Sequence, residues 1–305
     1  TESRNEVVVV GIDDASLQYL GAWPFDREIF SRLTDTLIDG GVKAIAYDVL
    51  FLETRSEGDA LFKGVLTDSK TPVILGAKIA SGKYYSSFLV DSTATKITSA
   101  LVNVSPDKDG KVRVYPRALQ TEGVCKNPLA LALFNVISFK EGASCEKEEV
   151  SYFRYPEEVT TYSALDILNG KVGKDLLQGK IILIGSTSLD LNDFFVSLTG
   201  EKIPGVIVHA SILTSLLNNE QDKEAPKVLS LLLIFIFSIG GTLAILVTRK
   251  VHHQIESIIF AIVASLAVTA LFFSKKLIVP FPWLVAAILL GAGYALLFKI
   301  RHEKK

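Results

Sequence analysis

Acidic side chains stand at the ends of two apolar stretches near the start of the chain. Asp13 and Asp14 follow residues 7–12, and Asp48 follows residues 43–47. Carboxylate oxygens are the ligands that hard divalent cations prefer, and they also accept hydrogen bonds from polar ligands. The three acids therefore predict a ligand site, in which Asp13 and Asp48 are the candidate metal ligands.

A structural role for the same acids is the alternative interpretation. Asp13 or Asp14 could cap a helix over residues 15–20, because aspartate is a preferred residue at helix N-termini. Asp48 could pair with a base such as Arg27, or it could simply face water. The sequence leaves both interpretations open.

Other polar residues could belong to the same site. Ser186 and Thr187 follow the apolar residues 180–185, and His209 is the only histidine before residue 226. Histidine changes charge near neutral pH, so His209 is a candidate for a pocket wall or a pH response, with a hydrogen-bonded structural role as the alternative. No zinc-ligand spacing or glycine-rich phosphate loop accompanies it, so the sequence identifies no cofactor. Trp23 is expected to fill the core, with stacking on a ligand as the alternative.

A strand, a helix and a second strand should position the acids. The β-branched run at residues 7–12 indicates a strand buried on both faces. Asp26 stands where a helix N-cap is expected, apolar residues then follow at helical spacing over residues 29–38, and residues 43–47 form the next buried stretch. Strands joined by a helix in this way are usually parallel. Asp13, Asp14 and Asp48 would then lie together at the carboxyl edge of the sheet, where parallel sheets bind ligands.

Later stretches extend this pattern to an α/β fold with a parallel or mixed central sheet flanked by helices. Residues 80–100 are polar and are expected to be irregular. Further helices are predicted at residues 58–67, 128–139, 164–168 and 206–217, and further strands at 73–77, 150–153 and 180–185.

Residues 101–104 and 112–115 predict a hairpin, because the turn between them ends in Asp109-Gly110. Asp107 and Asp109 faintly resemble a calcium loop, but the later carboxylates of such a loop are absent. We therefore expect no metal at this turn.

The last 80 residues differ in composition from the rest. Residues 1–225 carry 23 basic and 31 acidic side chains, whereas residues 226–305 carry nine and two. The acidic first part has no basic patch with interleaved aromatic residues, so we expect no nucleic-acid partner. Uncharged stretches of 21, 18 and 22 residues follow Lys227, Glu256 and Lys276, and each is long enough to span a bilayer. We predict transmembrane helices at about residues 228–248, 255–273 and 277–298.

The charges of the links predict the orientation in the cell membrane. The first link and the C-terminal tail carry six lysines and arginines, whereas the second link carries two. By the positive-inside rule, the tail is cytoplasmic and residues 1–225 are extracytoplasmic. In an oxidising compartment Cys125 and Cys145 could form a disulfide, with two unpaired thiols as the alternative.

Two further features concern packing and the extent of the chain. Small residues recur four apart in two of the spans, which allows close packing within the bundle or across a dimer. The chain has no methionine and begins at Thr1, so we expect it to be part of a longer polypeptide. The small residues are Ala261, Ser265 and Thr269, and Ala287, Gly291 and Ala295.

Several motifs resemble those of the CHASE2 sensory domain, in the same order along the chain. The resemblance departs from the family at Phe25, where tryptophan is usual, and the three spans after the domain are also typical of the family. The motifs are residues 7–14, 21–25 with Arg27, 41–51, 102–113, 179–185, 193–195 and 204–210.

This resemblance implies an extracytoplasmic sensor module of a bacterial receptor, which usually follows one upstream membrane helix. Three helices would connect it to a cytoplasmic output domain such as a class III nucleotide cyclase, a histidine kinase or a Ser/Thr kinase. The expected partners are an unidentified small ligand or ion, the lipid bilayer, a second copy of the chain and that output domain. The candidate ligand-binding residues are Asp13, Asp14, Trp23, Arg27, Asp48, Ser186, Thr187, Asp193 and His209.

Two other functions remain open at this stage. One is an extracytoplasmic enzyme that uses Asp13, Asp14 and Asp48 with a divalent metal, although no base or nucleophile stands beside these acids. The other is a dimerisation or assembly module without a ligand. We expect no enzymatic activity from this part of the receptor.

Overall fold

A computed structural model describes residues 6–90, 97–121, 123–140, 145, 150–156 and 158–303. The chain divides into two compact units, Thr1–Gln221 and Asp222–Lys305. This boundary lies four residues before the predicted one at 225.

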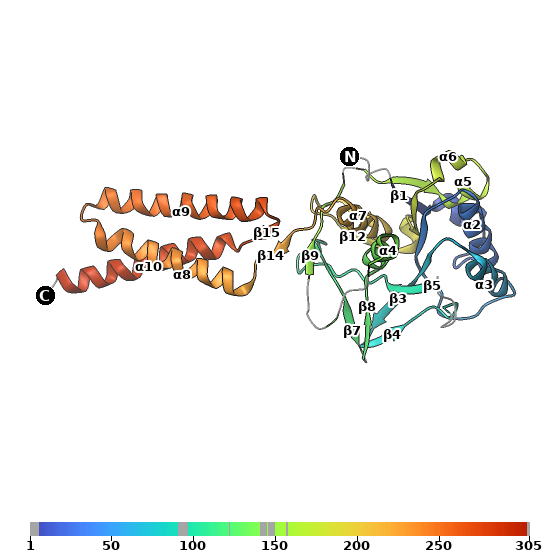
Figure 1. Ribbon diagram of the computed structural model, residues 1–305, viewed down its shortest axis with the longest axis horizontal. Helices are drawn as coiled ribbons and strands as arrows, with labels where there is room; N and C mark the ends of the chain where they lie inside the picture. Colours follow the sequence, from blue (N-terminus) through green and yellow to red (C-terminus); the bar gives the residue numbers. More distant parts are fainter. Residues whose placement is uncertain are drawn as a thin grey trace. The chain divides into compact units, whose positions relative to one another are not determined.

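The first unit is built on a mixed sheet, as predicted (Figure 1). Among the described residues, seven strands form it in the order β10-β1-β11-β2-β3-β4, and β5 pairs with β3 as well. Only the β3–β4 pair is antiparallel. The strands are β1 (Val7–Ile12), β2 (Ala44–Leu50), β3 (Val73–Ala80), β4 (Lys83–Tyr85), β5 (Ile97–Leu101), β10 (Thr160–Ser163) and β11 (Ile181–Ser186).

Helices cover both faces of this sheet. α2, α3 and α5 pack on one face, and α4 and α7 lie beside each other on the opposite face (Figure 1). We call these the α2 face and the α7 face. The helices are α1 (Asp14–Tyr19), α2 (Arg27–Asp39), α3 (Gly58–Asp68), α4 (Leu129–Ser138), α5 (Ala164–Leu168), α6 (Lys174–Leu177), the 3-10 helix η2 (Leu189–Leu191) and α7 (Gly205–Leu217).

The alternation of side chains along the strands divides the core between these faces. Every residue of β1 is buried, with Val8 and Val10 on the α2 face and Val7 and Val9 on the α7 face. The apolar run without polar alternation is therefore the signature of a central strand, as expected. The α2 face also holds a cluster of aromatic rings in edge contacts, formed by Trp23, Phe25, Phe30, Tyr47, Phe51 and Phe62.

The β1–α2–β2 unit is parallel, but its two strands are not neighbours. β11 lies between them and pairs in parallel with both. Strands in a sheet are spaced by about 4.8 Å, so β1 and β2 are roughly 10 Å apart. The strand that separates them comes about 130 residues later in the chain.

The predicted hairpin over residues 101–104 and 112–115 is wrong. β5 ends at Leu101 and joins the main sheet beside β3, whereas β6 (Val114–Pro116) pairs with β9 (Val150–Tyr152). The apolar residues before the turn are taken up by the parallel sheet, so they cannot pair with those after it. The expected irregular stretch at 80–100 contains β4 and most of β5, and residues 91–96 lie outside the described residues. Three further short strand pairs occur among the described residues. Two belong to the first unit, β7 (Leu119–Thr121) with β8 (Val124–Lys126) and β12 (Phe194–Val196) with β13 (Lys202–Pro204), and one belongs to the second unit, β14 (Lys223–Glu224) with β15 (Leu277–Ile278).

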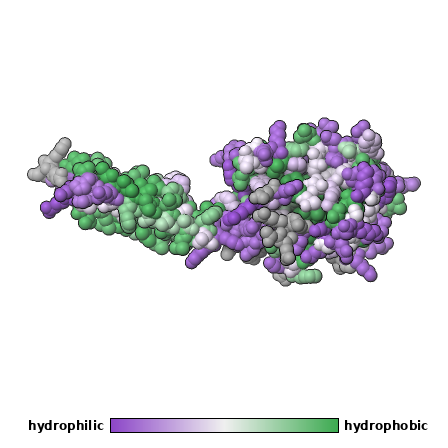
Figure 2. All heavy atoms as spheres, turned by 90° about the horizontal axis from the view of Figure 1, so that it is seen from above, coloured by the Kyte–Doolittle hydropathy of each residue, from purple (hydrophilic) through white to green (hydrophobic). Residues whose placement is uncertain are grey.

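The second unit contains the three predicted membrane spans. Within the described residues, α8 (Lys227–Val247), α9 (Val251–Ser274) and α10 (Phe281–Glu303) are long and apolar enough to cross a bilayer. Figure 2 shows their surfaces covered by hydrophobic residues. The third helix begins four residues later than expected, because Leu277 and Ile278 pair with β14 instead.

Glycines bring α8 and α10 into close contact. A Cβ on Gly241 would collide with the carbonyl of Ile288, and one on Gly291 with the carbonyl of Ser238. Ala295 packs nearby against Ile245. The predicted small residues of α10 therefore serve packing within one bundle, since the absence of side chains lets two membrane helices approach closely.

Candidate functional site

Asp48 lies in the middle of the sheet and is buried on the α7 face. Its register partner on β11 is Gly185, which in turn pairs with Gly11 on β1. The side chain is 7% exposed, and its Oδ1 atom lies 3.9 Å from Nε2 of His209, which is 1% exposed. An acid from β2 and a histidine from α7 thus meet inside the domain.

Asp193 is the third member of this cluster. Its backbone carbonyl accepts a hydrogen bond of 2.9 Å from the amide of Gly205, the first residue of α7. Its carboxylate lies against the same residue, because a Cβ on Gly205 would be 2.5 Å from Asp193 Oδ2. The charge of Asp193 also acts on Asp48. We call Asp48, Asp193 and His209 the acid–histidine cluster.

The cluster is electrostatically unfavourable for charge of either sign. Burial raises the pKa of Asp48 well above its ordinary value, and repulsion by Asp193 adds to this shift. Burial also raises the pKa of Asp193. Burial lowers the pKa of His209 to about 4, although the hydrogen bond to Val102 opposes that shift. Desolvation is the largest cause of the pKa shift in all three side chains, because burial disfavours the charged form of each.

Two polar atoms of the cluster lack partners. Asp48 Oδ2 and His209 Nδ1 are buried without a hydrogen bond to any of the described residues. His209 Nε2 lies 3.4 Å from the Val102 carbonyl, which can only accept, so Nε2 donates and Nδ1 of the neutral ring is left as an acceptor. His209 Nδ1 is therefore an acceptor, and Asp48 Oδ2 is an acceptor when the carboxyl is ionised, so the cluster can bind a proton, a cation or a hydrogen-bond donor.

Glycines allow the close packing around the cluster. A Cβ on Gly185 would lie 2.7 Å from Val206 Cβ and 3.0 Å from Asp48 Cβ. α7 can therefore approach β11 closely only because position 185 has no side chain. Gly185 and Gly205 were not predicted as site residues, although the turn Pro204-Gly205 marks the start of the helix that carries His209.

Asp13 and Asp14 follow β1 at the same carboxyl edge as Asp48, as predicted, but they are not part of this cluster, and the predicted single site of three acids is wrong. Asp13 caps α1: its Oδ1 accepts from the Ser16 amide at 2.8 Å and from the Ser16 and Ser163 hydroxyls at 2.6 and 3.0 Å. Asp14 accepts a hydrogen bond from Ser188. The physical reason is the strand order, since β11 separates the end of β1 from Asp48.

The hydrogen bonds of the helix cap determine the direction in which the pKa of Asp13 shifts. Burial opposes its ionised form, but the hydrogen bonds from Ser16 and Ser163 together outweigh this, so the pKa of Asp13 lies below its ordinary value. The structural interpretation of Asp13 therefore accounts for all of its described contacts.

Ser186 and Thr187 lie at the end of β11, near Gly11 rather than in the cluster. The Ser186 hydroxyl donates to the Ser188 carbonyl at 3.3 Å, and the Thr187 side chain covers Gly11.

Arg27 and Trp23 lie on the opposite, α2 face. Arg27 is 2% exposed, its Nε lies 3.6 Å from Asp59 Oδ1, and its guanidinium carbon is 4.7 Å from the centre of the Phe51 ring. The suggested pairing of Arg27 with Asp48 is therefore wrong. Trp23 packs on Phe25 with ring centres 5.2 Å apart, which agrees with the expected core role. Sequence reasoning missed Asp59, which gave no signal other than its place near the start of a helix.

The described residues do not gather a metal-binding group. None of their His, Cys, Asp and Glu side chains form a set of three or more placed to hold an ion. At the turn before β6, Arg113 donates to Asp107 at 2.6 Å and to both oxygens of Asp109 at 2.8 and 2.6 Å. An arginine thus occupies the carboxylates that had suggested a calcium loop.

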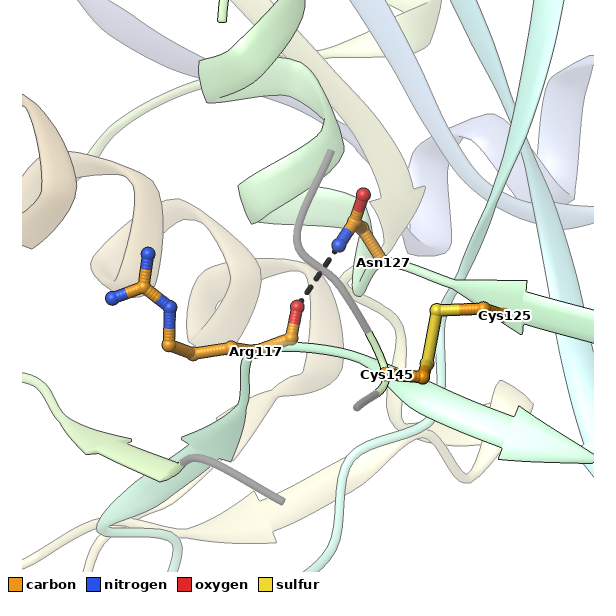
Figure 3. Close-up of a disulfide and its surroundings, with 4 residues drawn as sticks. All are labelled: Arg117, Cys125, Asn127 and Cys145. Carbon is orange, nitrogen blue, oxygen red and sulfur yellow. Dashed lines mark hydrogen bonds between the residues drawn. A yellow bond between two sulfur atoms is a disulfide. The ribbon is translucent and has the colours of Figure 1, made fainter. Parts of the chain in front are cut away.

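Cys125 and Cys145 are joined in the expected disulfide, with Cα atoms 5.9 Å apart (Figure 3). The bridge closes the segment that contains α4, one of the two helices of the α7 face. Beside it, the Asn127 side chain donates to the Arg117 carbonyl at 2.9 Å. Both contacts fix the chain where it enters α4.

Comparison with known proteins gives one match. A family model described as the CHASE2 domain matches residues 1–244, which include the whole first unit and most of α8. No curated protein and no solved structure matches the chain.

Proposed function

This chain belongs to the CHASE2 domain family, and on that premise we propose that it is the sensory and membrane-spanning portion of a receptor. A sensory domain followed directly by three helices able to cross a bilayer is the observation that carries the proposal. The family match is to a sensory domain, which fits a module that detects a signal and passes it on.

The orientation is part of the proposal. Positive charge in the α8–α9 link and after α10 favours a cytoplasmic C-terminus and an extracytoplasmic first unit. A cytoplasmic cyclase or kinase domain further along the polypeptide would then receive the signal, in a dimer of receptors. The disulfide supports an oxidising location for the first unit.

Reporters that are active only in the cytoplasm test this orientation. Attached after Lys305 or inserted between Arg249 and Lys250, they should be active, and inserted between Lys275 and Lys276 they should be silent. The reverse pattern would contradict the proposed topology.

We propose the acid–histidine cluster as the sensing site. Asp48 Oδ2 and His209 Nδ1 lack hydrogen-bond partners among the described residues, and desolvation disfavours the charged form of all three side chains. A cation or a hydrogen-bond donor that binds there would stabilise ionised Asp48, whereas a proton would stabilise its neutral form. Each would shift the balance between two arrangements of α7 and β11. A ligand acts in this way only through different affinities for the two states.

Thermal unfolding of the full chain in lipid nanodiscs tests the site. The probes are ammonium and methylammonium chloride, divalent cations with a chelator control, and pH from 5 to 8. A bound probe raises the unfolding temperature because it favours the folded state. The stabilisation should disappear in Asp48→Asn and persist in Asp35→Asn, a matched change at an exposed position of α2. Equal responses of both variants to every probe would contradict the assignment.

A further inference from the structure

The membrane unit has a groove of its own between α8 and α9. It is an open groove of about 640 Å³, and small residues of both helices line it. Phe260 also lines it, together with Glu256 and Ser257 near the start of α9. The small residues are Gly240, Ala244 and Ala261.

The groove lies within one leaflet. From Ile236, the lining residue of α8 farthest from Val247, to the end of the helix there are eleven residues, which correspond to about 16 Å of helix. This is about half of the roughly 30 Å hydrocarbon thickness of a bilayer. The length therefore suits an acyl chain that extends from the membrane surface to the midplane.

The shape of the groove suits an extended chain. Small residues from α8 and α9 line it, so an acyl chain can lie lengthwise between the two helices. Gly240 has open space beside it, because a Cβ there would meet nothing within 4 Å.

Charges of both signs occur near the start of α9, where Glu256 lines the groove. Glu256 is the only acid between residues 225 and 303, and its side chain is 68% exposed. Its carboxylate lies 3.0 Å from Nδ1 of His253, on the same side of α9. Arg249 and Lys250, in the link just before α9, are both exposed.

We infer that this groove binds a phospholipid whose headgroup carries a phosphate and a primary ammonium, the phosphatidylethanolamine class. The phosphate is attracted by Arg249 and Lys250, the ammonium donates hydrogen bonds to Glu256, and one acyl chain lies between α8 and α9. Basic residues at a membrane surface attract lipid phosphates in this way, and a carboxylate distinguishes an ammonium with N–H donors from a trimethylated one. The inference rests on the proposed membrane insertion of the helices, but not on the acid–histidine cluster.

Native mass spectrometry of the full chain with retained lipids tests this inference. The probes are phosphatidylethanolamine, phosphatidylcholine and phosphatidylglycerol with identical acyl chains. The parent chain should bind phosphatidylethanolamine about fivefold more tightly than phosphatidylcholine, the ratio expected for one exposed charge-assisted contact. Glu256→Gln should remove that preference, because it retains the shape of the side chain without its charge.

A matched pair of glycine variants tests the groove itself. Gly240→Leu places a side chain in the groove and should abolish the bound lipid. Gly293→Leu adds the same side chain to α10, where a Cβ also meets nothing within 4 Å, and should bind lipid as the parent does.

Three outcomes would overturn the inference. Equal binding of the three lipids to the parent would contradict headgroup recognition, and unchanged binding to Gly240→Leu would contradict the groove. Loss of dimers in Gly240→Leu without loss of lipid would assign the groove to a second copy of the chain. Failure of the parent to enter nanodiscs would instead contradict the proposed membrane function, so the two failures are distinguishable.

Discussion

The two faces of the central sheet each bury ionisable side chains, but they surround them differently. On the α2 face, Arg27 has an opposite charge beside it in Asp59 and lies over the Phe51 ring. On the α7 face, Asp48 has another carboxylate and a neutral histidine as its neighbours. Burial lowers the pKa of Arg27, and Asp59 partly offsets that cost, whereas Asp193 adds to the cost of a charge on Asp48.

This difference separates a structural role from a functional one. A buried charge with a partner stabilises the arrangement around it, and removal of either partner is destabilising. Buried acids without donors instead carry a free-energy cost, and strongly perturbed groups of this kind gather at functional sites. The comparison therefore supports a structural role for Arg27 and the proposed sensing role for Asp48.

The largest loss of stability should follow from removal of the Arg27–Asp59 ion pair on the α2 face. Arg27→Met removes the charge but retains a long apolar side chain, and it leaves Asp59 partly buried without its cation. We expect a loss of about 3–5 kcal/mol in the free energy of unfolding, as is typical when one partner of a buried pair is removed. Urea unfolding of the full chain measures it.

The double variant Arg27→Met with Asp59→Asn is the control for this prediction. Removing the second charge should recover part of the loss, because the stranded carboxylate is then gone. A loss below about 1 kcal/mol for Arg27→Met alone would mean that the α2 face does not depend on this pair.

Reduction of the disulfide should weaken the α7 face selectively. Cys125→Ser with Cys145→Ser opens a loop with a sequence separation of 20 residues, which is worth about 3 kcal/mol in the chain-entropy estimate. Hydrogen exchange should accelerate in α4, while α2 retains its protection. Equal acceleration in both helices would show that the two faces unfold as one unit.

Asp48→Asn should stabilise the chain at neutral pH, because burial disfavours the charged carboxylate and the neutral amide does not carry that cost. The pKa of Asp48 is raised on folding, so the folded chain holds this proton more tightly than the unfolded chain. The cost is absent below the ordinary pKa near 3.8 and grows as the pH rises towards the raised value. Unfolding of parent and variant from pH 4 to pH 8 should give curves that converge at the acid end.

His209 should change the pH dependence of stability in the direction opposite to that of Asp48. Its pKa falls from 6.5 to about 4 on folding, so the unfolded chain binds the proton more tightly. Stability should therefore decline as the pH falls from about 6.5 to about 4, and this decline should be steeper in Asp48→Asn, where the opposing contribution of Asp48 is removed. A variant whose stability is independent of pH over this range would contradict the burial of a neutral His209.

The smallest effect should come from a single hydroxyl on the α2 face. Thr34 donates to the Phe30 carbonyl at 2.7 Å and accepts from the Tyr47 hydroxyl at 2.6 Å. Thr34→Val leaves that buried hydroxyl without its acceptor, for a loss of about 1–2 kcal/mol. The loss should be the same at pH 5 and pH 8, in contrast to Asp48→Asn. A loss that varies with pH would mean that the two faces are coupled.

In this protein, the sequence predicts individual helices and strands better than it predicts which of them lie next to each other. The buried strand at residues 7–12, the helix that follows Asp26 and the three membrane spans are each encoded in a continuous stretch, and the structure contains all of them. Their periodicity and length are physical requirements of burial on both faces and of a bilayer.

The site depended on strand order, which periodicity does not determine. The strand β11 enters between β1 and β2 from far along the chain, so Asp13 and Asp48 are separated although each ends an apolar run. The sequence predicts Asp193 and His209 only as individual candidates. They meet Asp48 because α7 packs on β11, and the absence of a side chain at Gly185 permits that packing. The acid–histidine cluster depends on contacts between segments that are far apart in the chain, and a local sequence pattern does not determine such contacts.

The most direct test of the difference between the faces is the titration of individual carboxyl groups. Carbon NMR of the full chain in nanodiscs, with labelled aspartate, would follow Asp48 and Asp13 as the pH changes. Asp48 should titrate well above the ordinary aspartate pKa, because burial and Asp193 disfavour its charge, and Asp13 should titrate below it, because Ser16 and Ser163 hold its charged form. An Asp48 that titrates at or below Asp13 would contradict the account, since it would then have the donors that a structural acid needs.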